Sequence, residues 1–368
     1  DQVNSDLLKL KRECDGTKEQ KEISNLVLHL MHLMGKYEDF LTEHKEPEGK
    51  EVILKTYFNI RQFLGIHDVY NDKYITYTDY TEQGEFFVKL LCMDPSDNIK
   101  SRLDKVRSAV FFSATLLPVG YYQEQLGGRE EDYAVYAPSP FKRENRFIAV
   151  GRNVSTKYTR RNEAEYKKII EYIKTFTEAR KGNYMVFFPS YQMLDQIEER
   201  SRGILAGVTV QGSSMTEEER EGFLEDFLEA PDETRIAFCV MGGIFSEGID
   251  LKYDRLIGAV IVGAGLPMVS GENELYRKYY QEKKNSGFEY AYLYQGMNKV
   301  LQSAGRVIRT NEDKGAILLL EERFLDNRYQ ELFPREWYPF EVVNEKELRG
   351  LLERFWGIPV APMTVNED

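Results

Sequence analysis

The sequence has few cysteines and no long apolar run. Its three cysteines, Cys14, Cys92 and Cys239, are far apart, which argues against a disulfide framework or a zinc site and favours a reducing compartment. His29 and His32 have no Cys or acidic neighbour in sequence to complete a ligand set, so we expect no metal site. No run of eighteen apolar residues occurs and the first residues are polar. We therefore expect a cytoplasmic protein with neither a membrane span nor a signal peptide.

Basic residues are outnumbered by acidic ones. The chain has 49 Lys and Arg against 61 Asp and Glu, a net charge of −12, which argues against a broad nucleic-acid-binding surface. A protein that holds one strand in a narrow channel needs only local basic groups. The candidates are Lys157, Arg160 and Arg161, and Arg277, Lys278, Lys283 and Lys284. Solvated helix faces are the alternative explanation for both clusters.

The pattern of apolar residues divides the chain near residue 75. Before it, apolar residues from Ile23 to Tyr37 recur at three- and four-residue steps, which predicts packed helices. After it, β-branched and aromatic runs alternate with amphipathic helices such as 163–180, which predicts an α/β fold with a parallel sheet. The expected strands are 109–113, 146–150, 184–188, 207–210, 236–240, 259–262 and 316–320.

The most informative segment is Gln302-Ser303-Ala304-Gly305-Arg306-Val307-Ile308-Arg309. On a helix, Gln302, Arg306 and Arg309 would fall within an arc of about 60°, opposite the apolar residues. Arginine is a planar, permanently charged donor, so two arginines on one face suit the charge of a transferring phosphoryl group. The alternative is a helix with ordinary surface arginines.

Other short motifs follow the predicted strands. The strand ending at Val240 continues into a glycine-rich turn, Met241-Gly242-Gly243-Ile244-Phe245-Ser246-Glu247-Gly248-Ile249-Asp250-Leu251. Backbone N–H groups of such a turn can approach a phosphate at the carboxyl edge of a parallel sheet. Two further strands end in Phe188-Pro189-Ser190-Tyr191 and in Ser113-Ala114-Thr115. These strand ends and the two arginines predict one continuous functional surface.

In order and spacing these segments resemble motifs III to VI of superfamily-two helicases, specifically the XPD/DinG branch, over residues 76–335. Ser139-Pro140-Phe141 and Ser155-Thr156-Lys157-Tyr158 add to the resemblance. It implies a RecA-like parallel sheet flanked by helices and preceded by an all-helical arch. The implied domains are a partial arch over 1–75, the last strands of a first motor domain over 76–118, and a second motor domain over 119–368.

The resemblance also implies roles for single residues. Arg306 and Arg309 would reach the γ-phosphate of ATP held by the first motor domain, and Gln302 would position the attacking water. The implied nucleotide-side residues are Gly248, Asp250 and Gly305. The implied DNA contacts are Ser190, Tyr191, Ser246 and Glu247. Ser113 and Thr115 would couple the nucleotide cleft to the DNA channel.

Three features of the family are absent from the sequence. There is no Gly-x-x-x-x-Gly-Lys-Ser/Thr loop, no Asp-Glu-Ala-His segment and no four-cysteine set for an iron–sulfur cluster. In the family all three precede the arch, so we expect a chain that begins inside the arch. ATP and Mg²⁺ would then have their main ligands in a missing N-terminal motor domain of the same protein, with a possible 4Fe-4S cluster also upstream.

The leading interpretation is the C-terminal portion of an ATP-dependent 5′–3′ DNA helicase or translocase on single-stranded DNA, inactive as an ATPase by itself. The alternative is a catalytically inactive, stand-alone module that binds nucleic acid or a partner. An oxidoreductase or sugar-nucleotide transferase of the Rossmann type is a third class, but its Gly-x-Gly-x-x-Gly turn and following acidic residue are not found.

Overall fold

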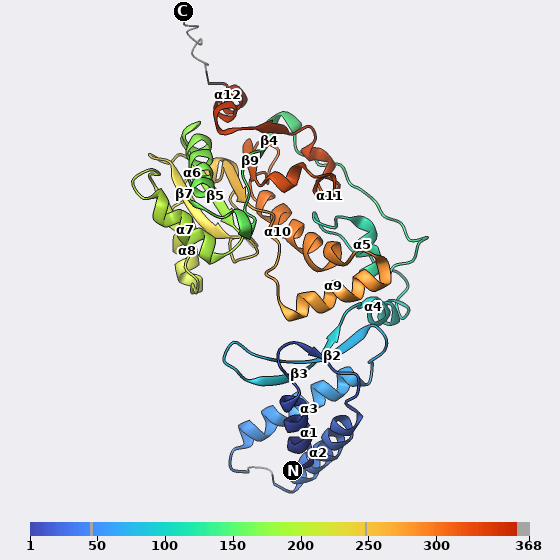
Figure 1. Cartoon of the computed structure of the whole chain (residues 1–368). Helices are drawn as coiled ribbons and strands as arrows, with labels where there is room; N and C mark the ends of the chain where they lie inside the picture. The colour runs from blue at the N-terminus through green and yellow to red at the C-terminus, as the bar shows by residue number, and fades with distance from the viewer. Residues whose placement is uncertain (45–46, 247–248, 359–368) are drawn as a thin grey trace, which may run out of the picture. The chain divides into compact units, whose positions relative to one another are not determined.

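The computed structural model describes residues 1–44, 47–246 and 249–358, which form two compact units (Figure 1). Unit 1 contains residues 1–111, 120–133 and 269–287. Unit 2 contains residues 112–119 and 134–268 together with the described residues from 288 onward. The two units therefore do not correspond to two consecutive stretches of sequence.

Unit 2 is built on a seven-stranded parallel sheet with the order β10-β4-β9-β8-β5-β7-β6. Every residue of β5, β8 and β9 is buried, as expected for a parallel sheet covered on both faces. The predicted parallel α/β sheet is thereby confirmed. Its strands are β4 (Arg146–Gly151), β5 (Asn183–Phe188), β6 (Val208–Val210), β7 (Arg235–Val240), β8 (Gly258–Val262), β9 (Gly315–Leu320) and β10 (Glu341–Val343).

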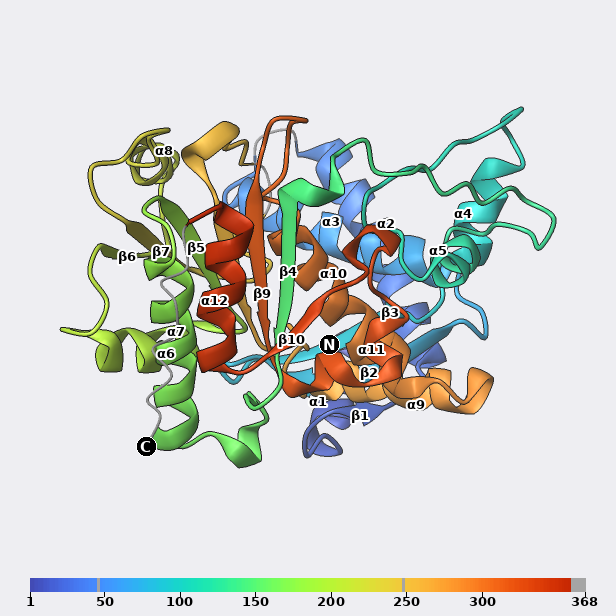
Figure 2. The same cartoon turned by 90° about the horizontal axis from the view of Figure 1, so that it is seen from above.

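Helices cover the two faces of this sheet with separate hydrophobic cores. On one face α6 (Glu163–Glu178), α7 (Tyr191–Ser201) and α12 (Glu345–Trp356) pack together, as Figure 2 shows. On the other face α10 (Tyr294–Ala304) buries Met297 and Val300. The remaining helical segments are η1 (Arg143–Asn145), η2 (Tyr158–Arg160), α8 (Glu217–Glu225), η3 (Tyr253–Arg255), the π-helix η4 (Glu289–Leu293), η5 (Glu322–Leu325), α11 (Asn327–Gln330) and η6 (Arg335–Trp337).

Unit 1 combines helices with an antiparallel sheet in the order β1-β2-β3. Val27 of α2 packs against Ile60 and Leu64 of α3, which confirms the predicted helical packing of the N-terminal segment. Its elements are α1 (Gln2–Arg12), β1 (Lys18–Glu19), α2 (Ser24–Glu43), α3 (Lys50–His67), β2 (Tyr74–Tyr80), β3 (Phe86–Cys92), α4 (Ser96–Leu103), most of α5 (Val119–Gln125) and α9 (Gly271–Lys284).

Helix α9 packs in unit 1 although its sequence lies inside the segment predicted as the second motor domain. Tyr276 and Tyr279 of α9 pack against Tyr77 and Met93. The Tyr77 hydroxyl donates to Glu272 at 2.7 Å, and the Tyr280 hydroxyl donates to the Met93 carbonyl at 2.7 Å. Which parts of the units are arch and which are motor domain stays a prediction.

The expected strand 109–113 is wrong. Val110 and Phe112 are 84% and 89% exposed, and the segment pairs with no strand in the described part of the chain. A run of apolar residues predicts a strand only when a partner edge is present. Residues 74–92, which the sequence did not predict as strands, instead form the antiparallel pair β2 and β3.

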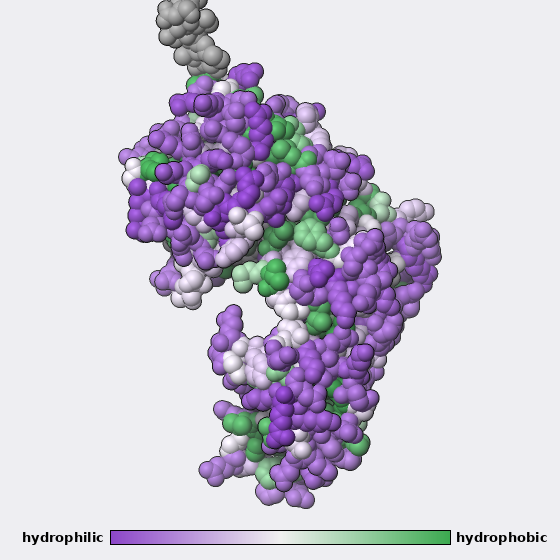
Figure 3. Space-filling model, in the orientation of Figure 1, coloured by the Kyte–Doolittle hydropathy of each residue, from purple (hydrophilic) through white to green (hydrophobic). Residues whose placement is uncertain are grey.

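None of the described helices has the length and apolar character needed to cross a lipid bilayer. The face of the molecule drawn in Figure 3 is mostly hydrophilic, with apolar side chains in small separate patches. His29 is paired through Nδ1 with Asp6 at 2.6 Å. The three cysteines are free thiols.

Candidate functional site

The glycine-rich turn that follows β7 is a tightly hydrogen-bonded loop. Gly242 has φ +72°, a left-handed conformation that favours glycine, and its N–H donates to the Ser246 hydroxyl at 3.0 Å. That hydroxyl also donates to the Val240 carbonyl at 3.3 Å and lies 3.2 Å from the Ser303 hydroxyl of α10. The loop is therefore fastened to α10.

Ser246 has a different position from the one predicted for it. Its exposed fraction is 0%, because the hydroxyl closes the turn and faces α10. A DNA strand could reach this hydroxyl only if the loop opened. The neighbouring predictions, Glu247 as a DNA contact and Gly248 as a nucleotide contact, lie outside the described residues.

Arg306 and Arg309 converge on one carbonyl group near the end of this turn. Arg306 Nη1 donates to the Ile249 carbonyl at 3.2 Å and Arg309 Nη2 donates to the same oxygen at 3.0 Å. Arg309 Nε also lies 3.6 Å from Asp250, whose carboxylate is 3.1 Å from Lys252. The two guanidinium groups, Ile249 and Asp250 thus form a half-exposed cluster, which we call the arginine cluster.

The two arginines do not share a helix, contrary to the sequence prediction. Helix α10 ends at Ala304, and Gly305 caps it by donating its N–H to the Leu301 carbonyl at 2.9 Å. Beyond it, the Asp313 carboxylate accepts from the backbone N–H groups of Arg309 at 2.6 Å and Thr310 at 2.8 Å. A carboxylate that binds successive N–H groups competes with the helical hydrogen bonds.

The predicted buried face of this segment is confirmed, since Val300, Ala304, Val307 and Ile308 are all buried. Gln302 is half-buried on α10, and its carbonyl accepts from Arg306 Nε at 3.3 Å. Asp313 was not identified from the sequence. In the structure its side chain is buried, only 3% exposed, and it also accepts a hydrogen bond from Tyr253 N at 2.9 Å. Asp313 thereby links the segment that follows Ile249 to the segment of Arg309.

At the end of β5, Ser190 and Tyr191 begin α7. The Ser190 hydroxyl caps the helix by accepting from Met193 N at 3.3 Å. The Tyr191 hydroxyl donates to the Gly212 carbonyl at 3.2 Å and accepts from Gln211 Nε2 at 2.9 Å, and burial raises its pKa. Gln211 Oε1 in turn accepts from Val240 N at 3.0 Å. Gln211, missed in the sequence, links Tyr191 to the glycine-rich turn.

Ser113 and Thr115 belong to the short segment 112–119 of unit 2, where Ser113 is exposed and Thr115 is half-buried. Their hydroxyl oxygens are 3.2 Å apart, and Thr115 N donates to the Ser113 hydroxyl at 3.2 Å. Among the described residues, their side-chain hydrogen bonds connect them only to each other. Their coupling role stays a prediction.

The loop after β4 is held by two buried carboxylates that the sequence did not reveal. Glu321, 0% exposed, accepts from Thr156 N at 2.8 Å and from Arg323 Nη2 at 3.0 Å. Glu165, 5% exposed, accepts from Ser155 N at 3.1 Å. These bonds fix the loop in place while leaving Tyr158 82% exposed at its tip.

Most of the candidate basic residues are ion-paired. Lys157 and Arg160 lie 3.5 and 2.9 Å from Glu322, whereas Arg161 donates to the Thr156 carbonyl and lies 5.7 Å from the centre of the Tyr158 ring. The second cluster is paired with acidic residues of unit 1, so the solvated-face explanation is favoured there. Its pairs are Arg277 with Glu274, Lys278 with Glu19, Lys283 with Asp72, and Lys284 with Glu124.

The family model described as a helicase C-terminal domain matches residues 173–340, from within α6 to the residue before β10. The match includes the glycine-rich turn, Asp250 and both arginines. Residues 173–340 form a helicase C-terminal domain that is similar to those of the XPD and DinG helicases. The predicted resemblance is thereby confirmed. The match contains strands β5 to β9 of the RecA-like sheet, whereas β4 and β10 lie outside it.

Curated relatives match a larger share of the chain than the helicase C-terminal domain alone. The ATP-dependent DNA helicase DinG of Photobacterium profundum is 24% identical over 277 residues, covering 72% of this chain and 39% of that protein. The helicase subunit XPD/RAD3 of general transcription and DNA repair factor IIH from Saccharomyces cerevisiae is 25% identical over 264 residues, covering 66% and 33%. The chain thus spans about a third of the length of these helicases.

Solved structures share the fold. One described as XPD_APO has a TM-score of 0.59 and 19% identity, covering 93% of this chain and 68% of that chain. Another, described as XPD_Helicase, has a TM-score of 0.57 and 20% identity, covering 93% and 61%. The likeness extends beyond the helicase C-terminal domain into the N-terminal segment.

Proposed function

We propose that the complete protein is an ATP-dependent DNA helicase that moves 5′ to 3′ on single-stranded DNA. In it, this chain supplies the arginine cluster to ATP held by another motor domain. The observation that carries the proposal is the convergence of Arg306 and Arg309 on the Ile249 carbonyl at 3.2 and 3.0 Å. Guanidinium groups form stronger, charge-assisted hydrogen bonds with a phosphate than with a neutral carbonyl, even with Asp250 lying 3.6 Å from Arg309.

The arginine cluster fits the phosphate end of ATP, not its metal ion. Two guanidiniums beside the half-exposed Asp250 could contact the γ-phosphate, and Gln302, on the same segment, could orient a water molecule. The described residues contain no group of three or more His, Cys, Asp or Glu that could hold a metal ion. Mg²⁺ would therefore depend on another domain. When bound, ATP and Mg²⁺ supply the phosphoryl group and its charge neutralisation.

The glycine-rich turn could connect this nucleotide side to DNA. Val240, the last residue of β7 before the turn, is tied through Gln211 to Tyr191, and Ile249 near the end of the turn is tied to the two arginines. A phosphate that drew Arg306 and Arg309 away from Ile249 would release one end of the same loop. The proposed consequence is a shift of Tyr191, whose ring could stack on a base.

The proposed activity is tested with the complete protein. We expect ATP hydrolysis that single-stranded DNA stimulates, and unwinding of a duplex with a 5′ single-stranded tail. A duplex with a 3′ tail is the matched control and should stay paired. ATP hydrolysis that DNA does not change, or equal unwinding of both duplexes, would contradict the proposal.

A second prediction concerns Tyr158, whose exposed ring beside Arg161 resembles a platform for stacking bases. Replacing Tyr158 with alanine in the complete protein should weaken binding of a single-stranded oligonucleotide about five- to hundredfold, the contribution of one stacked base. Fluorescence anisotropy at fixed salt concentration measures the affinity.

The matched control is Tyr133→Ala, because Tyr133 is 99% exposed but lies in unit 1. This control should bind the oligonucleotide as the unmodified protein does. If both variants kept full affinity, or lost it equally, Tyr158 would not be a specific DNA contact.

A further inference from the structure

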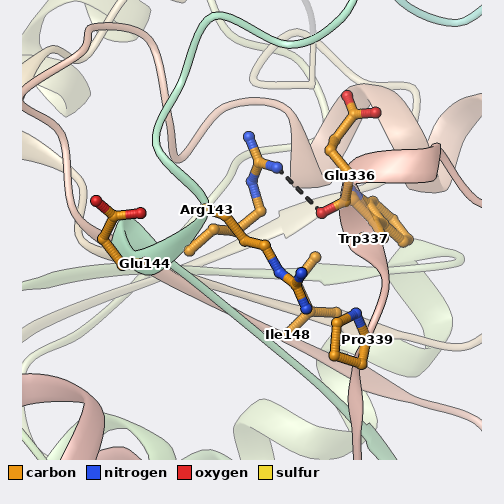
Figure 4. A pocket seen from close by; sticks show the side chains of 7 residues that line it. Arg143, Glu144, Ile148, Glu336, Trp337 and Pro339 are labelled. Carbon is orange, nitrogen blue, oxygen red and sulfur yellow. Dashed lines mark hydrogen bonds between the residues drawn. The ribbon is translucent and has the colours of Figure 1, made fainter.

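Unit 2 contains a cavity of about 320 Å³ beside the start of β4 (Figure 4). None of its residues belongs to the arginine cluster or to the glycine-rich turn. It lies where the segments leading into β4 and β10 run next to each other, so its residues come from sequence positions almost two hundred apart. The lining residues are Arg143, Glu144, Arg146, Ile148, Glu336, Trp337 and Pro339.

The cavity contains a guanidinium that is not directly paired with a carboxylate of the described residues. Arg146 is half-buried, and its side chain donates to the Glu336 carbonyl at 3.3 Å and to the Ser139 hydroxyl at 3.4 Å. Both acceptors are neutral. Burial lowers the pKa of Arg146. In the described part of the chain, no carboxylate lies within ion-pair distance of Arg146 or of Arg143, which lines the same cavity.

The two acidic residues of the cavity are directed elsewhere. Figure 4 shows the carboxylates of Glu144 and Glu336 at opposite margins of the cavity, pointing away from each other. The Glu336 carboxylate accepts a hydrogen bond from the Tyr136 hydroxyl. The Arg335 guanidinium lies over the Tyr136 ring, 4.6 Å from its centre. These contacts hold the Glu336 carboxylate beyond ion-pair distance of Arg146, so that its charge acts on the guanidinium only from further away.

A half-buried cation without a counterion is energetically unfavourable unless a ligand supplies the charge. Arginine's planar donor fork fits oxyanions such as phosphate and carboxylate in a bidentate manner. Ile148, Trp337 and Pro339 give the cavity an apolar part, and its volume is in the range of small-molecule sites. A ligand would therefore have one anionic group and a small organic body.

We propose that this cavity binds the oxyanion group of a small ligand between Arg143 and Arg146. The phosphate of a mononucleotide-sized metabolite and the carboxylate of an organic acid share this chemistry. The site is separate from the proposed ATP contact. Its occupancy does not depend on whether Arg306 and Arg309 act in hydrolysis.

Trp337 provides a direct readout of the cavity. The chain has two tryptophans, so a Trp356→Phe variant leaves Trp337 as the single tryptophan. Inorganic phosphate, adenosine monophosphate and succinate are each titrated into this variant of the full chain at constant ionic strength. We expect a saturable change in Trp337 emission with at least one of them. Saturation by the two phosphates assigns a phosphate ligand, and saturation by succinate alone assigns a carboxylate.

Arginine variants in the same background test where the anion binds. Arg143→Gln and Arg146→Gln should each lower the affinity for the anion that changes Trp337 emission by about tenfold. This is the contribution of one charge-assisted pair. Arg202→Gln is the matched control, because Arg202 is 71% exposed on the surface of the same unit. The affinity of this variant for the anion should not change. Arg143 lies at the exposed margin, so its variant remains informative if Arg146→Gln does not fold.

A second control separates this site from the proposed ATP contact. Arg306→Gln should leave the anion-induced change in Trp337 emission intact. This expectation holds whether or not Arg306 contributes to ATP hydrolysis. The inference is overturned if no anion gives a saturable change, or if Arg143→Gln binds as tightly as Arg202→Gln. It is also overturned if Arg306→Gln alone abolishes the response.

Discussion

Replacing Arg309 with alanine in the complete protein should reduce the kcat of DNA-stimulated ATP hydrolysis by about a thousandfold or more, and Arg306→Ala should have a similar effect. Arginines that contact a transferring phosphoryl group contribute on the order of 10³–10⁵ in rate. Both side chains already converge on Ile249, 3.2 and 3.0 Å from its carbonyl oxygen. Steady-state hydrolysis at saturating ATP and DNA measures the effect.

Controls for this experiment separate chemistry from folding and from DNA binding. Arg349→Ala removes an arginine that is 60% exposed on α12 and paired with Glu353 at 3.1 Å, and it should leave kcat unchanged. DNA affinity without nucleotide should also stay the same in Arg309→Ala. Hydrolysis by Arg309→Ala at the rate of the unmodified protein would remove the basis of the proposed function.

Replacing Glu321 with glutamine should lower the free energy of unfolding of unit 2 by about 3 kcal/mol or more. Removing one partner of a buried ion pair leaves the other charge uncompensated, which costs about 3–5 kcal/mol. Here the orphaned partner is Arg323, 3.0 Å from Glu321. Urea denaturation followed by tryptophan fluorescence measures the loss.

The matched control is Glu341→Gln, since Glu341 is exposed at the start of β10; its effect should stay within about 0.5 kcal/mol. Combining Glu321→Gln with Arg323→Met should cost less than the sum of the two single changes, because both belong to one pair. Simple additivity of the two losses would show that the pair does not act as a unit.

The contribution of Glu321 should also depend on pH. Burial by itself raises the pKa of this carboxyl, but the hydrogen bond and charge of Arg323 and the bonds from Thr156 lower it overall, below its ordinary 4.5. The unfolded chain then binds the proton more readily than the folded one. The stabilisation is complete above pH 4.5 and is lost as the pH falls below it. The difference in the free energy of unfolding between Glu321→Gln and the unmodified protein should therefore become smaller as the pH falls below 4.5.

The sheet could be predicted from sequence because its strands are buried on both faces. Runs such as 184–188 and 316–320 contain almost only apolar residues, and both became central strands. The same logic failed at 109–113, an equally apolar run without a partner strand among the described residues. It also missed β2 and β3, a hairpin whose buried side packs against α9, which is far away in the sequence.

The site could be predicted as residue types but not as geometry. The spacing of Arg306 and Arg309 suggested that they lie together, and both do contact the Ile249 carbonyl, yet they meet through a loop shaped by Asp313. Nothing in the sequence distinguishes Asp313, Glu321 or Gln211 from surface residues. Their importance comes from burial and from backbone groups of other segments, which only the folded chain brings to them.

The position of α9 has a practical consequence for dissecting this protein. The backbone leaves unit 1 and returns to it twice, at residues 120 and 269, before remaining in unit 2. No single cleavage can therefore release either unit intact. A recombinant fragment starting near residue 134 would carry α9 with Leu275, Tyr276 and Tyr279 stripped of their apolar neighbours. Such a fragment would tend to aggregate, whereas expression with residues 1–133 in trans could restore a soluble assembly.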